Sequence, residues 1–148
     1  MRQFGINLAQ AIIIFSSLIL LSACSDDADI KEIDNPKVVT TAFFNALYNE
    51  RDVDKAASVC SPPIAKLLKH YRSVPSIGKY MFNMMYDKVH ITTDDSGVKV
   101  REQFNHTAEV IIYFDGYYQN ERTKDVKRVL LKEVGNRWII SEILKDPF

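Results

Sequence analysis

Apolar residues recur at helical spacing in the first part of the chain that follows residue 35. From Val39 to Leu47 they return at intervals of three or four, which places them on one face of a helix. Asn35 followed by Pro36 is typical of a helix start, because the amide side chain caps free backbone N–H groups and proline suits the first turn. The pattern therefore predicts a first helix over residues 36–50.

Two further helices and one ambiguous segment follow. Asp52 is placed to cap a short second helix, because its carboxylate can accept hydrogen bonds from the first backbone N–H groups. Ser61 and Pro62 open a third helix, whose apolar stripe consists of Ile64, Leu67, Leu68 and Tyr71. Val74-Pro75 is expected to end this helix. The methionine-rich segment 77–86 fits either a short helix or an extended passage.

From residue 88 onward apolar and polar positions alternate, which indicates strands. Residues 89–93 form the first such segment, and residues 94–97 have the composition of a turn. The alternation continues through residues 98–114, with a break near Asn105. This stretch is therefore either one long bent strand or two strands, and the core face of its second half consists of Ala108, Val110, Ile112 and Phe114.

The remaining residues form two more strands. The polar residues 119–121 are a turn signal that precedes a strand over residues 126–134. Gly135-Asn136 is a two-residue hairpin signal, and residues 138–144 form the last strand. Helices are thus followed by an antiparallel meander, which predicts an α+β fold with three to four N-terminal helices and about four strands.

The composition is that of a globular protein. The chain has 148 residues, of which 47% are hydrophobic and 26% are charged, which suits one domain. Lys and Arg together number 19, and so do Asp and Glu. Because binding to nucleic-acid phosphates depends on an excess of basic residues, no nucleic-acid partner is expected.

The first 23 residues have the pattern of an export signal. Arg2 gives a basic start, residues 11–21 are apolar, and Ser22-Ala23 are small. The apolar run is shorter than the roughly 20 residues that cross a bilayer. A cleaved signal peptide is therefore favoured, and an uncleaved anchor helix is the alternative.

The run Leu21-Ser22-Ala23-Cys24 resembles the lipobox of bacterial lipoproteins. The resemblance implies cleavage before Cys24, lipid on its sulfur and acylation of the new amino terminus; several acyl chains hold a protein firmly on a membrane. Ser25 implies sorting to the outer membrane, so we expect a lipid-anchored protein of the bacterial cell envelope that faces the periplasm. The expected parts are a signal peptide (1–23), the lipidated cysteine with a flexible tether (24–35) and one domain (36–148).

The other candidate ligands and nucleophiles indicate no cofactor. Cys60 is the only cysteine besides the lipidated one, and its small apolar neighbours predict a buried, inert thiol. His70, His90 and His106 lack the spacing of a zinc site, and the chain has no glycine-rich phosphate loop. Neither a metal nor another cofactor is expected.

The order of elements resembles the nuclear transport factor 2-like superfamily. The likeness rests on the opening run Asn35–Leu47 and the closing run Gly135–Ile140, and it covers roughly residues 36–145. It implies a curved antiparallel sheet that wraps the first helix into a cone. The superfamily includes ketosteroid isomerase and polyketide cyclases as well as small lipoproteins without an assigned activity, so the fold alone transfers no chemistry.

Acidic and tyrosine side chains on one strand are the candidates for acid–base chemistry. Glu109, Tyr113 and Asp115 share one face of the strand and could line the interior of a cone. Alternatively they form its solvated or interface face, which a strand with one buried face favours. The isomerase residues do not map onto this chain, so no catalytic constellation is recognised and an enzyme is not expected.

Aromatic residues suggest where a ligand would bind. Close packing favours a filled core over a cavity, but a cavity with tyrosine hydroxyls would suit a small hydrophobic ligand. The candidates for lining such a pocket are Phe43, Phe44, Tyr48, Glu109, Tyr113, Asp115 and Trp138. The basic residues over 122–132 are interpreted as an exposed strand protected against aggregation, with an acidic partner or lipid headgroups as the alternative.

These observations favour a membrane-anchored envelope lipoprotein with a non-catalytic domain that binds a ligand or a protein. The alternatives are an isomerase- or cyclase-like enzyme with an apolar cone pocket, and a structural protein that forms a homodimer through the outer face of the sheet. The expected partners are the membrane through Cys24, a small hydrophobic ligand or an envelope protein, and a second copy of the chain.

Overall fold

Helices precede a four-stranded sheet in the computed structural model, which describes residues 35–94 and 106–145. The helical part contains α2 (Pro36–Tyr48), α3 (Val53–Ser58), α4 (Pro62–Tyr71), α5 (Val74–Ile77) and a π-helical turn, η2 (Gly78–Phe82). The strands are β1 (Lys88–Thr93), β2 (Thr107–Tyr118), β3 (Glu121–Val134) and β4 (Arg137–Leu144). The predicted α+β fold is confirmed.

Capping side chains fix the starts of the first two helices. The Asn35 side chain accepts a hydrogen bond from the backbone N–H of Lys37 at 2.9 Å, and Pro36 occupies the first turn of α2. The Asp52 carboxylate accepts from the backbone N–H of Lys55 at 2.8 Å and starts α3. Both predicted caps are confirmed, because capping depends only on neighbouring residues.

The sheet is an antiparallel meander with strand order β1-β2-β3-β4. Gln119 and Asn120 join β2 to β3, and Gly135 and Asn136 join β3 to β4. All four residues have positive φ values, between 50° and 69°, as two-residue hairpin turns of the twisted type require. The Gly135-Asn136 hairpin predicted from sequence is therefore confirmed.

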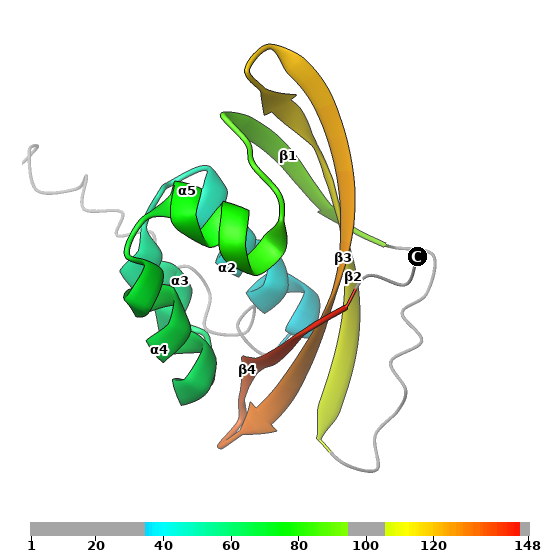
Figure 1. Ribbon diagram of the computed structural model, residues 1–148. Helices are drawn as coiled ribbons and strands as arrows, with labels where there is room; N and C mark the ends of the chain where they lie inside the picture. The colour runs from blue at the N-terminus through cyan, green and yellow to red at the C-terminus, as the bar shows by residue number, and fades with distance from the viewer. Residues whose placement is uncertain (1–34, 95–105, 146–148) are drawn as a thin grey trace, which may run out of the picture.

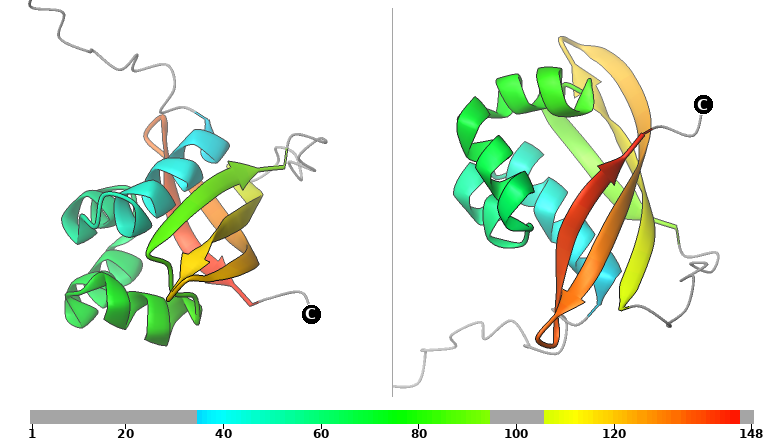
Figure 2. Two further views of the ribbon diagram at one scale, coloured as in Figure 1. Left: turned by 90° about the horizontal axis from the view of Figure 1, so that it is seen from above. Right: turned by 60° about the horizontal axis from the view of Figure 1, so that its bottom comes forward.

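The helices all lie on one face of the sheet, and the sheet curves around α2 (Figures 1 and 2). The concave face of β2 carries the predicted core residues, all buried: Ala108, Val110, Ile112 and Phe114. Phe44 on α2 meets them, with ring centroids 4.9 Å from Phe114 and 5.5 Å from Phe82. The concave side of the sheet therefore contains a filled aromatic core.

The connection between α3 and α4 pairs with the outer edge of β4 at Ile140. Cys60 forms a parallel bridge with Ile140. The backbone N–H of Ser61 donates to the Ile140 carbonyl at 2.7 Å, and the Ile140 N–H donates to the Val59 carbonyl at 2.9 Å. Cys60 is buried, as predicted, and burial raises the pKa of its thiol to about 12. Capping an edge in this way protects it from pairing with other chains.

The helical region agrees with prediction at one point and departs from it at another. The third helix ends at Tyr71, before Val74-Pro75, as predicted, and these two residues also begin α5 behind the cap Ser73. Proline is accepted in the first turn of a helix, so it starts a helix here. Leu67, expected on the buried stripe, is 41% exposed, whereas Leu68 is fully buried. The reason is that α4 packs mainly against α3 and has little contact with the sheet.

Several predictions concern residues outside those described. They are the export signal, Cys24, the tether up to residue 34, most of the turn over 94–97 and the strand expected over 98–104. Within residues 35–94 and 106–145, no helix combines the length and the apolar character needed to cross a membrane.

Candidate functional site

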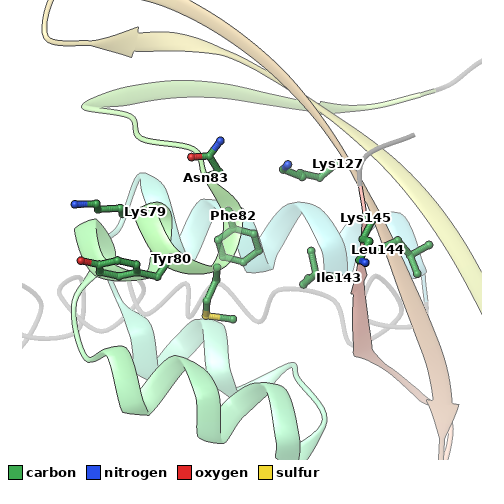
Figure 3. A pocket seen from close by; sticks show the side chains of 9 residues that line it. Lys79, Tyr80, Phe82, Asn83, Lys127, Ile143, Leu144 and Lys145 are labelled. Carbon is green, nitrogen blue, oxygen red and sulfur yellow. The ribbon is translucent and has the colours of Figure 1, made fainter. Parts of the chain in front are cut away.

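A pocket of about 310 Å³ lies between the π-helical turn η2 and the end of β4 (Figure 3). Residues 79–83 form one side and residues 143–145 the other, and Lys127 comes from the neighbouring strand β3. The volume is at the lower end of the range of roughly 300–1,000 Å³ found for small-molecule sites. This volume is large enough for a small organic ligand.

The pocket has an apolar side that the core holds in place. Phe82 is buried and packs edge to face on Phe43, with ring centroids 6.2 Å apart. Ile143, on the opposite side, also packs against the core. At the rim, Tyr80 is 62% exposed and stacks on Tyr71 at 5.8 Å. A ligand would thus find a preformed apolar surface beside an exposed aromatic ring.

Local backbone geometry shapes the helical side of the pocket. A Cβ on Gly78 would lie 2.5 Å from the carbonyl oxygen of Met84, so only glycine allows the two segments to approach this closely. The Met84 N–H donates to the Gly78 carbonyl at 3.0 Å, and Asn83 ends the turn in a left-handed conformation, φ 52°. Single π-helical turns of this kind are frequent at functional sites.

The pocket is lined by three lysines, which are Lys79, Lys127 and Lys145. Its described lining contains no carboxylate. Lys127 is only 7% exposed. It lies on the concave face of β3, opposite Ile112 in the register, and Figure 3 shows its side chain directed from the sheet toward Phe82 and Asn83. The described lining therefore combines lysine side chains with an apolar wall.

Lys127 is the exception to the interpretation of the basic strand as exposed. That interpretation took residues 122–132 as an exposed strand whose charges prevent aggregation. β3 pairs with β2 over residues 121–132 but with β4 only over residues 128–134. Arg122, Lys124 and Lys132 are exposed, as expected, whereas Lys127 is buried. Lys127 points into the molecule because it shares the strand face of Val129 and Leu131, both fully buried.

A second polar feature of the concave face is the pair Tyr86 and Asp125. The Tyr86 hydroxyl donates a hydrogen bond to the Asp125 carboxylate, and the Tyr48 hydroxyl donates to the Met84 carbonyl at 3.2 Å. Burial first, and the Asp125 carboxylate second, raises the pKa of both tyrosines, so both stay protonated donors. The adjoining cavity, of about 50 Å³, has room for roughly one or two waters. The pair joins β3 to the segment before β1.

The seven residues expected to line a pocket do not come together. Phe43, Phe44 and Tyr48 are buried in the aromatic core, and Trp138 packs partly buried against it. The other three occupy the convex face of β2, opposite the core face: Glu109, Tyr113 and Asp115. None of the seven lines the 310 Å³ pocket.

Ion pairs hold the acidic residues of the convex face. The Arg122 guanidinium donates two hydrogen bonds to Asp115, at 2.8 and 2.7 Å, and the Lys124 ammonium lies 3.4 Å away. Hydrogen bonding to Arg122 lowers the pKa of Asp115 to about 2. Arg128 donates to Glu109 at 3.0 Å. These side chains therefore lie on the solvated or interface face of β2 and not in the interior of a cone. Dimerisation through this face stays a prediction.

Metal ligands do not gather in the part of the chain that the structure describes, where no group of three or more His, Cys, Asp or Glu side chains could hold an ion. The three histidines are exposed. Sequence reasoning missed the pocket lysines, although one signal was present: Lys127 interrupts an apolar strand face.

No family model matches this chain, and no curated protein or solved structure matches it significantly.

Proposed function

We propose that the domain binds a small molecule, without transforming it, in the pocket between η2 and β4. The observation that carries this proposal is the pocket itself, an open depression of about 310 Å³ with Phe82 on one side and Ile143 on the other, because small molecules bind in concave sites with apolar and polar lining groups. The carboxylates considered for acid–base chemistry support binding over catalysis. Glu109 and Asp115 lie on the opposite face of the sheet and are engaged by arginines.

The proposal places this domain on a membrane. The lipobox-like run ending at Cys24 supports a lipid anchor in the cell envelope, and residues 24–35 would form the tether. The order of helices and strands, with the sheet curved around α2, supports the likeness to the nuclear transport factor 2-like cone. A lipid-anchored binding domain would hold its ligand close to the membrane surface.

Ligand binding is expected to shift the NMR signal of the Met81 methyl group, because Met81 lines the pocket. The full-length chain, labelled with [¹³C-methyl]methionine in phosphatidylcholine nanodiscs, is titrated with octanoate and with 1-octanol. For about ten non-hydrogen atoms we expect a saturable shift with a Kd of about 1 mM or lower for at least one probe. Met84, buried in the core, serves as the internal reference and should not move.

Two tryptophan variants separate pocket binding from partition into lipid. Ile143→Trp places a large side chain in the pocket lining and should abolish the Met81 shift. Ile139→Trp makes the same change on the same strand, outside the lining, and should preserve it. Absence of a Met81 shift with both probes, or a shift that survives in Ile143→Trp, would contradict the proposed function.

The membrane anchor makes a separate prediction about mass. The mature native chain is expected to begin at Cys24 and to carry the added mass of acyl chains, whereas Cys24→Ala should carry none and should not be cleaved at that position. Mass spectrometry of the membrane fraction measures both. Cys60→Ala, which removes the buried thiol, should keep the lipid mass. A native chain without acyl mass, or cleavage of Cys24→Ala at the same site, would refute the anchor.

A further inference from the structure

We propose that the surface formed by α4 and η2 docks on a membrane that contains anionic lipids. The surface consists of three apolar or aromatic side chains and the two lysines beside them, and it is called the α4–η2 patch below: Leu67, Tyr71, Tyr80, Lys66 and Lys79. This inference goes beyond ligand binding. It rests on the proposed function only for the anchor that holds the chain at a membrane.

The segment that contains the patch is positively charged. Residues 55–86 include five Lys or Arg residues and no Asp or Glu, although the whole chain has 19 residues of each sign. Lys55 and Lys69 form ion pairs with acidic side chains. Lys66 and Lys79 are exposed and form no ion pair with any residue that the structure describes. Each cation close to an anionic membrane strengthens binding by a factor of roughly five, so the charge of the patch is complementary to such a surface.

Exposed apolar and aromatic side chains lie among these charges. Leu67 is 41% exposed and Tyr80 is 62% exposed. Tyr71 follows Leu67 by one turn of α4 and stacks on Tyr80 with ring centroids 5.8 Å apart. The Lys79 ammonium lies 5.3 Å from the centroid of the Tyr80 ring. Tyrosine is enriched at the interface between bilayer and water, and apolar groups beside cations strengthen binding to anionic lipids. Basic and apolar groups on one surface therefore favour a membrane over a soluble anion.

The patch lies on the side of the molecule that faces away from the sheet. Figure 3 shows Lys79 and Tyr80 on η2, at the end of the pocket farthest from the strands. Fully extended, residues 24–35 would reach about 36–40 Å, which exceeds the radius of gyration of about 13 Å for a domain of this size. The proposed anchor alone thus leaves open which face meets the bilayer, and the patch decides it. Because Tyr80 is also part of the pocket lining, docking turns the rim of the pocket toward the membrane.

The test measures which face of the domain touches the bilayer. Tyr80→Trp and Tyr117→Trp introduce the same side chain at exposed positions, one on the helical side and one on the convex face of the sheet. The full-length chains are reconstituted in nanodiscs whose phosphatidylcholine has brominated acyl chains, which quench nearby tryptophan, with or without phosphatidylglycerol. The quenching of Trp138, measured in the native chain, is subtracted. With phosphatidylglycerol, quenching at position 80 should exceed that at position 117 by roughly threefold or more, and without it the two should be equal.

Lysine variants test whether charge drives the docking. Lys66→Gln combined with Lys79→Gln, in the Tyr80→Trp chain, should lower the quenching to the level found with phosphatidylcholine alone. The matched control, Lys88→Gln combined with Lys132→Gln, removes two exposed lysines of the sheet and should leave the quenching at position 80 unchanged. Circular dichroism of each variant measures its helix content. If the change at Lys79 lowers that content, Lys66→Gln alone replaces the pair, and a smaller decrease in quenching is expected.

The outcomes separate docking from the other proposals. Equal quenching at positions 80 and 117 with phosphatidylglycerol, or quenching at position 80 that survives the loss of the lysines, would overturn docking by the patch. A change in the fluorescence at position 80 on addition of soluble polyglutamate, without quenching in the phosphatidylglycerol nanodiscs, would assign the patch to an acidic protein instead. Ligand binding is decided separately by the Met81 shift, and the anchor by the mass of the mature chain, so each proposal can fail alone.

Discussion

Replacing Phe44 with alanine is expected to lower the free energy of unfolding by about 3–5 kcal/mol, the range for deleting a buried aromatic ring. Phe44 has no exposed surface. Its ring packs edge to face on Phe43, Phe82 and Phe114, so the substitution opens a cavity where α2 meets the sheet. The rings on three sides leave the structure little room to relax into this cavity. We therefore expect the decrease in the free energy of unfolding to lie near the upper end of that range.

The measurement is guanidinium unfolding of the full-length chain, followed by the fluorescence of its single tryptophan, Trp138. Tyr117→Ala is the matched control, because Tyr117 is an aromatic residue of the same sheet that is 53% exposed. Tyr117→Ala should lower the free energy of unfolding by less than about 1 kcal/mol. A loss for Phe44→Ala no larger than that of Tyr117→Ala would show that the helix and sheet are not packed through this ring.

Replacing Gly116 with alanine is expected to cost about 2–3 kcal/mol through a clash instead of a cavity. A Cβ on Gly116 would lie 2.5 Å from the carbonyl oxygen of Lys88 and 2.9 Å from the Cα of Val89. Both are backbone atoms of β1, so neither can turn aside as a flexible side chain would. The first strand would have to move away from β2 and from the ring of Tyr86, whose Cδ1 lies 2.7 Å from the same point.

Gly135→Asn is the control for that substitution. A Cβ on Gly135 has no heavy atom within 4 Å, and asparagine tolerates the positive φ of 55° found there. The control should stay within about 0.5–1 kcal/mol of the native chain in the same unfolding measurement. An equal, small loss at both glycines would refute the close approach of β1 to β2.

Features of the fold that depend on neighbouring residues could be predicted from sequence. Asn35 and Asp52 cap helices, and Gly135-Asn136 forms a hairpin, because capping and turn geometry are local properties. The alternation from Ala108 to Phe114 identified the core face of β2 because side chains alternate across any strand. The start of α5 was harder to predict, since proline is compatible both with stopping a helix and with starting one.

The candidate site depends on pairings between distant segments, which the sequence does not specify. The pocket requires η2, β3 and the end of β4 to meet, and the form of η2 depends on the approach of Gly78 to Met84. The acidic residues illustrate the same limit. The alternation along β2 placed Glu109 and Asp115 on the same face of the strand. Which face this is depends on the packing of the helices, which cover the opposite face, so the two carboxylates meet arginines on the convex side.

The bridge between Cys60 and Ile140 has a consequence for the order in which the molecule is assembled. The carbonyl of Val59 and the N–H of Ser61 find their partners on Ile140 of β4, so the connection between α3 and α4 is complete only once β4 has taken its place. Contacts between segments so far apart slow folding. A chain that stopped before residue 137 would leave the Val59 carbonyl and the Ser61 N–H without these partners, so it would disturb the connection between α3 and α4 as well as the sheet.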